Sequence, residues 1–200
     1  MSLGTDEGIY LEGARRISQG QVLYRDIFAF TGPGTFWLIA LIFKLSGIAI
    51  SHARLLLIGD LALITTLTYW LGARLLSRRA ALALAFVVFS FETGFVFRLY
   101  INHRWDSAAL ALASIVLVCA GTLQPLRWRF FAAGLLGAAA ACITPPIALV
   151  AAAVLLWWIG QRDLRSYIWP YLAGFSMVSM LVAGVLWYQG SIPALIDSLW

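Results

Sequence analysis

Residues 6–20 read DEGIYLEGARRISQG and form the most charged stretch of a strongly apolar chain. Its apolar and small residues recur at helical spacing, which predicts a short amphipathic helix. Thr5 is placed to cap that helix and Gly20 to end it. Because such a helix beside membrane spans lies in the interface rather than across the bilayer, we expect residues 6–20 to lie there.

The composition predicts an integral membrane protein. Of the 200 residues, 62% are hydrophobic, and the mean hydropathy is +0.88, whereas soluble domains are about 45–50% apolar. The net charge is +5, but the basic residues fall in short loops between apolar runs, which argues against a nucleic-acid partner. Cys119 and Cys142 lie inside apolar runs and are expected to be buried thiols, not a disulfide or a metal site.

The apolar runs predict an all-α polytopic membrane protein, since a spanning helix needs about 20 apolar residues. The expected spans cover residues 53–76, 80–97, 107–123, 130–144, 146–160 and 167–188. The break at Thr144-Pro145-Pro146 separates two of them, because proline removes a helix donor. Residues 35–45 are apolar but short, and we interpret them as a second interfacial or re-entrant helix. A short true span is the alternative.

Positive charge orients membrane spans, because cytoplasmic loops are enriched in arginine and lysine. The arginines near residues 78–79, 127–129 and 162–165 can all be cytoplasmic only if residues 35–45 do not cross. That arrangement places residues 6–34, 98–106, 144–146 and 191–200 together on the outer side, and we adopt it. If residues 35–45 do cross, the acidic stretch and the 98–106 loop lie on opposite sides.

Asp6 and Glu7 are candidates for a general base. A carboxylate can remove a proton from a hydroxyl nucleophile, and a low-dielectric environment raises its pKa toward a useful value. The alternative is that acids at a helix start only complement its dipole. Both readings stay open from position alone.

A second group of polar residues falls in the predicted loop 98–106. Arg98 and Arg104 are unexpected in an outer loop, and their guanidinium groups suit phosphate oxygens. The alternatives are contact with lipid headgroups and an ion pair with Asp106. His103 could bind a metal but lacks a ligand set at the right spacing, so no metal site is predicted and nothing supports a divalent cation.

Two acidic residues lie inside apolar runs, where ionisable groups suggest function by default. Glu92 lies about 9 Å along a helix from the predicted outer end, so it could face a cavity there. Its role stays open. We interpret Asp60 as structural, paired with Arg54 on the same predicted helix.

The pattern Asp6-Glu7-x-x-Tyr10-x-Glu12-x-x-Arg15, ending at Gly20, resembles the first outer loop of the GT-C membrane glycosyltransferases. It is most similar to family 39, which contains protein O-mannosyltransferases and lipid A aminoarabinose transferases, and to the related RgtA/B/C/D-like domain. The likeness continues, in order, at residues 32–47 with Arg54, at residues 102–106, and at residues 143–146.

The resemblance implies a GT-C-like transmembrane bundle with interfacial helices in the first outer loop. It implies inverting transfer of a sugar from a polyprenyl-phosphate donor to a lipid or envelope-glycan acceptor, at the outer face of the plasma membrane (the inner membrane of a bacterium). No cofactor is implied beyond this lipid-linked donor. The implied roles are Asp6 as base, Glu7 as its support and Asp106 in the cavity, with Arg98 or Arg104 as the candidate that stabilises the departing phosphate. Our candidates for substrate binding are Tyr10, Glu92, Arg98, His103 and Arg104.

Two positions depart from the family pattern. Gly32 stands where the aminoarabinose enzymes have a lysine, and Pro145 replaces the lysine of a "TKP" break, which argues against that substrate. The resemblance also implies a chain that is incomplete at both ends and inactive alone. The rival hypothesis is a non-catalytic transporter or flippase component that binds lipid phosphate through Arg98 and Arg104. Transporters place charge near the midplane, so charge at one face favours the enzyme.

Overall fold

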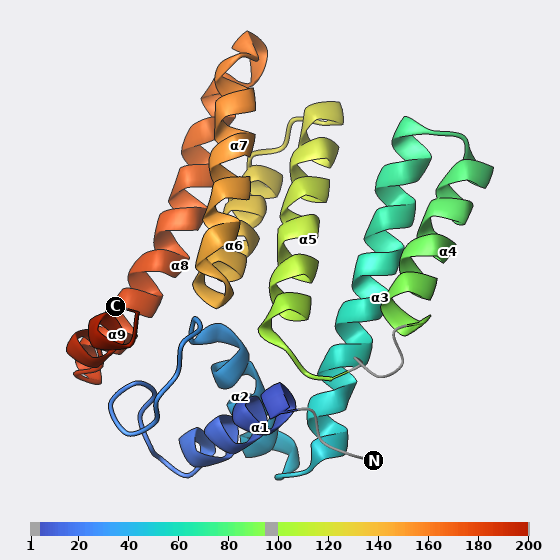
Figure 1. The fold of residues 1–200 in the computed structure, drawn as a ribbon. Helices are drawn as coiled ribbons and strands as arrows, with labels where there is room; N and C mark the ends of the chain where they lie inside the picture. Colours follow the sequence, from blue (N-terminus) through green and yellow to red (C-terminus); the bar gives the residue numbers. More distant parts are fainter. Residues whose placement is uncertain (1–4, 95–99, 200) are drawn as a thin grey trace.

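The computed structural model describes residues 5–94 and 100–199, without the side chains of residues 5, 6, 159, 162 and 199. The predicted all-α class is confirmed: no strand occurs among the described residues, and helices dominate (Figure 1). The α-helices are α1 (Thr5–Ser18), α2 (Gly34–Ser46), α3 (Ile50–Leu75), α4 (Arg78–Gly94), α5 (His103–Leu123), α6 (Arg127–Ile143), α7 (Ala148–Ile159), α8 (Ile168–Tyr188) and α9 (Ile192–Leu199). Short 3-10 helices cover Pro145–Ile147 and Arg162–Tyr167.

Three helical segments are long and apolar enough to cross a membrane. They are Ile50–Leu75, His103–Leu123 and Asp163–Tyr188. Gly34–Ser46 and Pro145–Trp158 are also apolar but shorter. The protein therefore has helices of the length and composition that a membrane protein needs.

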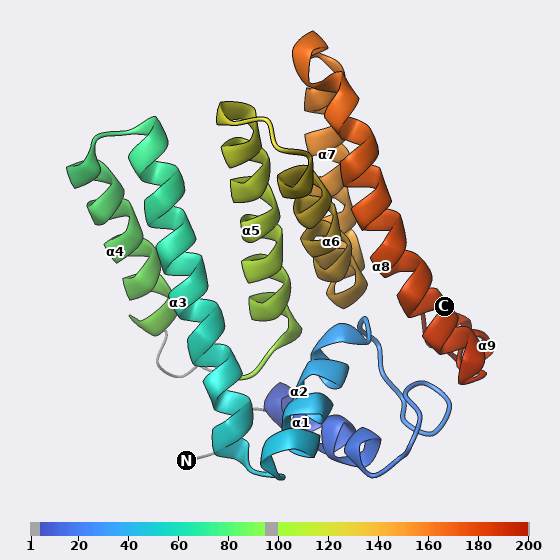
Figure 2. The same cartoon turned by 180° about the vertical axis from the view of Figure 1, so that it is seen from behind.

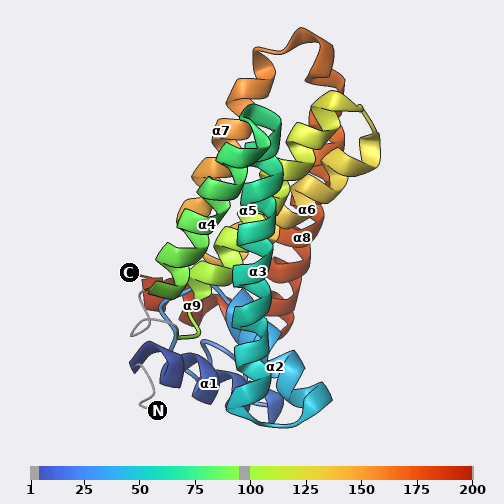
Figure 3. The same cartoon turned by 90° about the vertical axis from the view of Figure 1, so that its right-hand side faces the viewer.

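Helices α3 to α8 run side by side, and α1 and α2 lie across one end of them (Figures 1 and 2). We call this the capped end. The starts of α3 and α5 and the ends of α6 and α8 reach it, and α9 lies beside it (Figure 3). Four segments that are distant in sequence thus meet under the α1–α2 layer.

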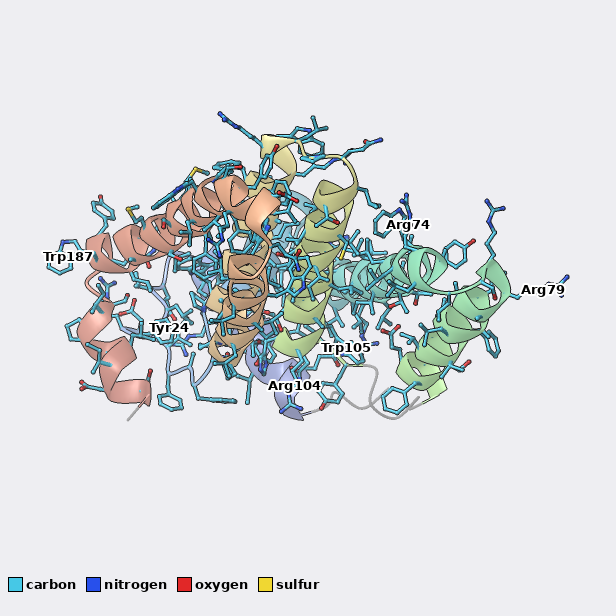
Figure 4. All side chains as sticks on the ribbon, turned by 90° about the horizontal axis from the view of Figure 1, so that it is seen from above. Tyr24, Arg74, Arg79, Arg104, Trp105 and Trp187 are labelled. Atoms are coloured by element: carbon cyan, nitrogen blue, oxygen red, sulfur yellow. The ribbon has the colours of Figure 1, made fainter. Side chains whose placement is uncertain are left out.

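The opposite end, which we call the arginine end, contains residues 72–79, 124–129 and 160–167. These segments carry seven arginines and one acidic residue, Asp163. Arg74 and Arg79 extend outward there (Figure 4). These seven arginines are half of the 14 basic residues of the chain, whereas Asp163 is one of nine acidic residues, so what sets this end apart is its lack of acidic residues.

Glycines allow the closest packing in the bundle, between α6 and α8. A Cβ on Gly134 would lie 2.0 Å from the Tyr171 carbonyl oxygen, and one on Gly174 would lie 2.1 Å from that of Phe131. Small residues at such crossings let two helix backbones approach. These contacts hold the α6–α8 half of the bundle as a unit.

Some predicted boundaries were wrong. The predicted loop 98–106 is helical from His103 onward, because the Asn102 side chain caps α5 by accepting from the Arg104 amide at 3.0 Å. The predicted helix 146–160 begins as a 3-10 turn, since two adjacent prolines supply no amide hydrogens, and α7 has only 12 residues. The end of the predicted span 80–97 lies outside the described residues.

Candidate functional site

Helix α1 packs its apolar face on α2, as the spacing of its residues predicts. Tyr10 and Ala14 are buried, and the Tyr10 ring lies 4.9 Å from the ring of Phe36 between centroids. Gly20, with φ of 98°, follows the end of α1 at Ser18, and its amide donates to the Ile17 carbonyl. The helix is thereby fixed with its acidic first turn at the capped end.

The Glu7 carboxylate is held by Arg54 at the start of α3. Arg54 donates from Nε and Nη2 to the two carboxylate oxygens, each at 3.0 Å, while Glu7 is only 1% exposed. A bidentate pair of this kind is strong and directional. Glu7 therefore positions α1, and the interpretation that Arg54 pairs with Asp60 was wrong.

A second buried acidic group joins three helices. Asp106, in the first turn of α5, accepts a hydrogen bond from the hydroxyl of Thr35 at the start of α2. Asp60, from the middle of α3, lies close enough to interact with it, and Oδ2 of Asp60 has no hydrogen-bond partner within the described residues. Thr35, Asp60 and Asp106 are all buried, so the pair is enclosed between helices.

A chain of aromatic contacts links α1 to α5. The Tyr10 hydroxyl lies 2.6 Å from Nδ1 of His103 and 3.5 Å from the Thr31 hydroxyl. The Tyr24 hydroxyl donates to the Thr31 carbonyl at 2.7 Å. These contacts hold the loop between α1 and α2 next to the start of α5.

Gly32 brings that loop against the end of α6. Its amide donates to the Ile143 carbonyl at 3.2 Å, and a Cβ would lie 1.9 Å from the Cys142 carbonyl oxygen. Thr144, just beyond α6, donates to the Ser107 hydroxyl at 2.9 Å. The position where a family lysine would stand is therefore one of close backbone approach, with no room for any side chain.

A cavity of about 400 Å³ opens beside this cluster, between the end of α4 and the start of α5. It is lined by Phe91, Glu92, Tyr100, Asn102, Arg104, Trp105 and Ala108. Glu92 is buried and accepts a hydrogen bond from the Thr65 hydroxyl at 3.4 Å. Arg104 and Trp105 project side by side near this opening (Figure 4), and Arg104 makes no ion pair within the described part of the chain.

The structure places the predicted site residues in two adjoining groups. Glu7, Tyr10, His103 and Asp106 lie in the contacts between α1, α2, α3 and α5, while Glu92 and Arg104 line the cavity. Asp6 lies in the first turn of α1, but its side chain is not described, and Arg98 falls outside the described residues. His103, Arg104 and Asp106 belong to a helix rather than to the predicted loop.

Sequence reasoning missed Asp60 and Thr35. Asp60 carried the right signal, an ionisable residue inside an apolar run, but was assigned to a local pair with Arg54. Thr35 carried none. Among the described residues, no three His, Cys, Asp or Glu side chains gather as metal ligands would.

Compared with protein-family models, with curated proteins and with solved structures, the chain matches none of them. The resemblance to GT-C glycosyltransferases therefore remains a sequence-based expectation.

Proposed function

We propose that this protein is a membrane glycosyltransferase that moves a sugar from a polyprenyl-phosphate donor to a lipid or envelope-glycan acceptor. One observation supports this most. The acidic first turn of α1, the buried Asp106 carboxyl and the Glu92–Arg104 cavity come from three separate helices, yet they all lie at the capped end. A shared site there is what the transfer reaction needs.

The proposed chemistry assigns a role to each of these groups. The acceptor hydroxyl oxygen attacks the anomeric carbon of the sugar, and Asp6 takes the hydroxyl proton. The bond from that carbon to the phosphate oxygen breaks, and the lipid phosphate leaves with the electron pair. Arg104 is the cation available in the cavity to stabilise that phosphate. Glu7 is committed to Arg54 and acts by positioning α1.

The surroundings of the cavity suit a lipid donor. A second hollow of about 420 Å³ runs along α4 and is lined by Phe86, Val87, Ser90, Phe91 and Gly94. Phe91 lines both spaces, so this apolar hollow adjoins the cavity that is lined by Arg104. A phosphate at Arg104 could thus carry its polyprenyl chain along α4.

The orientation that we propose follows from the three short arginine-rich loops, because such loops are typical of the cytoplasmic side. With the arginine end in the cytoplasm, the capped end faces outward, where envelope glycans are available. The rival role as a transporter or flippase component finds less support. Glu7 and Asp106 lie in first turns and Glu92 lies near the end of α4, so Asp60 alone among the described buried acids lies toward the middle of a long helix, whereas transporters place such groups near the midplane.

The deciding experiment is a transfer assay with the complete gene product in membranes, using a panel of polyprenyl-phosphate hexoses as donors. Asp6→Asn removes the proposed base and should abolish transfer while the protein still folds. Glu12→Gln is the matched control, because Glu12 is an exposed carboxylate on the same helix, paired with Arg15. Normal turnover by Asp6→Asn would sink the assignment of the base, and lipid binding without transfer by the unaltered protein would favour the rival.

A further inference from the structure

The cavity between α4 and α5 contains a polar group that a lipid phosphate alone does not require. Arg104 suits phosphate oxygens, whereas Glu92, which also lines the cavity, offers atoms that accept hydrogen bonds. The phosphate diester that joins a sugar to a lipid carries no hydrogen to donate. Glu92 therefore suits another part of the ligand, one that carries hydrogen-bond donors.

Glu92 has few hydrogen-bond donors of its own. Its side chain is only 6% exposed, and within the described part of the chain it accepts one long hydrogen bond, from the Thr65 hydroxyl at 3.4 Å. It makes no ion pair there. A carboxylate can accept about four hydrogens, and burying a polar group is costly unless it is hydrogen-bonded. Its carboxyl group can thus accept hydrogens from a ligand in the cavity.

Trp105 supplies an aromatic surface to the same cavity. Its ring is half-buried and packs against the core of the capped end. Asn102 caps the helical turn that carries Trp105 and Arg104, which fixes the backbone of both. The two side chains project next to each other at this opening (Figure 4). An indole ring of this kind offers a large apolar face at a fixed place.

We infer that this cavity binds the sugar ring of the lipid-linked donor, with Trp105 against the C–H face of the ring and Glu92 accepting hydrogens from its hydroxyl groups. A pyranose has both features, an apolar face of C–H groups and a rim of hydroxyl donors. The cavity volume of about 400 Å³ falls within the usual range for small-molecule sites. This inference rests on the proposed function, because it takes the ligand at Arg104 to be a sugar linked to a lipid phosphate.

The arrangement assigns specificity and affinity to different residues. Arg104 binds the phosphate, which every polyprenyl-phosphate lipid carries, whereas Glu92 and Trp105 contact only the sugar. A site built to hydrogen-bond a hydroxyl group rejects an analogue that lacks it, because the buried protein group is then left unpaired. The preferred donor is therefore a hexose with free ring hydroxyls, and deoxy sugars should bind more weakly.

Binding of two lipids to the full chain in nanodiscs tests the inference. One is a polyprenyl-phosphate hexose and the other is the same polyprenyl phosphate without a sugar, each displacing a fluorescent polyprenyl phosphate. Glu92→Gln and Trp105→Leu should each weaken binding of the hexose lipid by about tenfold and leave the sugar-free lipid unchanged. Arg104→Ala should weaken both lipids. Glu12→Gln, at an exposed carboxylate, should change neither.

Deoxy donors extend the test to the unaltered protein, so that no variant has to fold. Replacing the ring hydroxyl that Glu92 contacts by hydrogen should weaken binding by about tenfold, and Glu92→Gln should reduce this difference. Equal affinity for the hexose, deoxy and sugar-free lipids would overturn the inference. Equal weakening of the hexose and sugar-free lipids by Glu92→Gln would also overturn it, because Glu92 would then act only in packing.

The transfer assay separates this inference from the proposed function. A preference for the hexose lipid that Glu92→Gln removes, in a protein that transfers no sugar, would support the sugar site and contradict the transferase. Transfer by a protein that binds the hexose and sugar-free lipids equally would contradict the sugar site alone.

Discussion

Arg54 and Glu7 are 47 positions apart, yet the guanidinium of one holds both carboxylate oxygens of the other at 3.0 Å. The pair fixes the acidic start of α1 against the start of α3. Because Glu7 is almost completely buried, its charge depends on this one described cation. The ion pair therefore joins α1, which covers the capped end, to the long apolar helix α3.

Removing Arg54 should be strongly destabilising. Arg54→Ala leaves a buried carboxylate without its cation, a change that costs about 3–5 kcal/mol in other proteins. Arg54→Lys should recover part of the loss, since it restores the charge but not the two-pronged geometry. Denaturant unfolding in detergent measures both. The control is Arg25→Ala, which breaks an exposed pair with Asp26 and should cost much less, because water screens an exposed ion pair. Equal losses in Arg54→Ala and Arg25→Ala would show that the Glu7 pair is not a buried anchor.

Tyr10→Phe should lower stability by about 1 kcal/mol, the usual net value of one hydrogen bond. The phenyl ring keeps the contact with Phe36, while the contact of the hydroxyl group with His103 and Thr31 is lost. Tyr188→Phe serves as control, because Tyr188 is 91% exposed. Thermal unfolding should show a lower stability for Tyr10→Phe than for Tyr188→Phe. If the stability of Tyr10→Phe equals that of the unaltered protein, this link between α1 and α5 contributes nothing.

Gly32→Ala should damage the capped end more than its small size suggests. The new methyl group would meet the Cys142 carbonyl oxygen at 1.9 Å, so the loop or the end of α6 must move, at a cost of about 1–3 kcal/mol. Gly59→Ala is the matched control. It adds the same methyl group to an exposed site in α3 with no atom within 4 Å, and should stabilise that helix by up to about 1 kcal/mol. Similar unfolding free energies for the two variants would contradict the close approach at Gly32.

The sequence predicted the features that depend on local pattern. The amphipathic helix at residues 6–20 follows from spacing within one segment, and the all-α class follows from long apolar runs. The start of α5 was missed although its cap, Asn102, is a standard N-cap residue. The charged residues of that turn favour a loop by their polarity, whereas Asn102 predicts the start of a helix.

The contacts that build the site depend on tertiary packing and could not be read from the sequence. The hydroxyl of Thr35 reaches Asp106 across 71 positions, and Tyr10 reaches His103 across 93. Nothing in the local sequence separates Arg54 as a partner of Glu7 from Arg54 as a partner of Asp60. Asp60 is nearer to Arg54 along the same helix, so the sequence favours that pair. In the structure Arg54 pairs instead with the distant Glu7.

Asp26 gives the protein a defined acid-sensitive contact in the loop between α1 and α2. Hydrogen bonds from Arg25 and from the Val22 amide lower the pKa of Asp26 to about 2. A lowered pKa means that the contact stabilises the fold above the usual aspartate pKa, and that this contribution disappears as the pH falls toward 2. Asp26→Asn should therefore be less stable at neutral pH and should lose less on acidification. Parallel curves for the two proteins from neutral to acidic pH would contradict this role.

Arg104 should determine the affinity of the cavity for lipid phosphate. Arg104 and Glu92 both line the cavity of about 400 Å³, together with several apolar residues. Arg104 makes no ion pair within the described residues. A hydrogen bond to a charged group contributes about 1.5–3 kcal/mol, so Arg104→Ala should weaken binding of a polyprenyl phosphate by about tenfold or more. Arg104→Lys should recover only part of this affinity, because lysine lacks the planar guanidinium group.

Arg79→Ala is the control, because it removes the same charge at the arginine end and should leave binding unchanged (Figure 4). Binding is measured with the full chain in nanodiscs that contain a fluorescent polyprenyl phosphate, at several salt concentrations. Equal weakening by Arg104→Ala and Arg79→Ala would mean that the lipid responds to overall charge, and that the cavity is not its site.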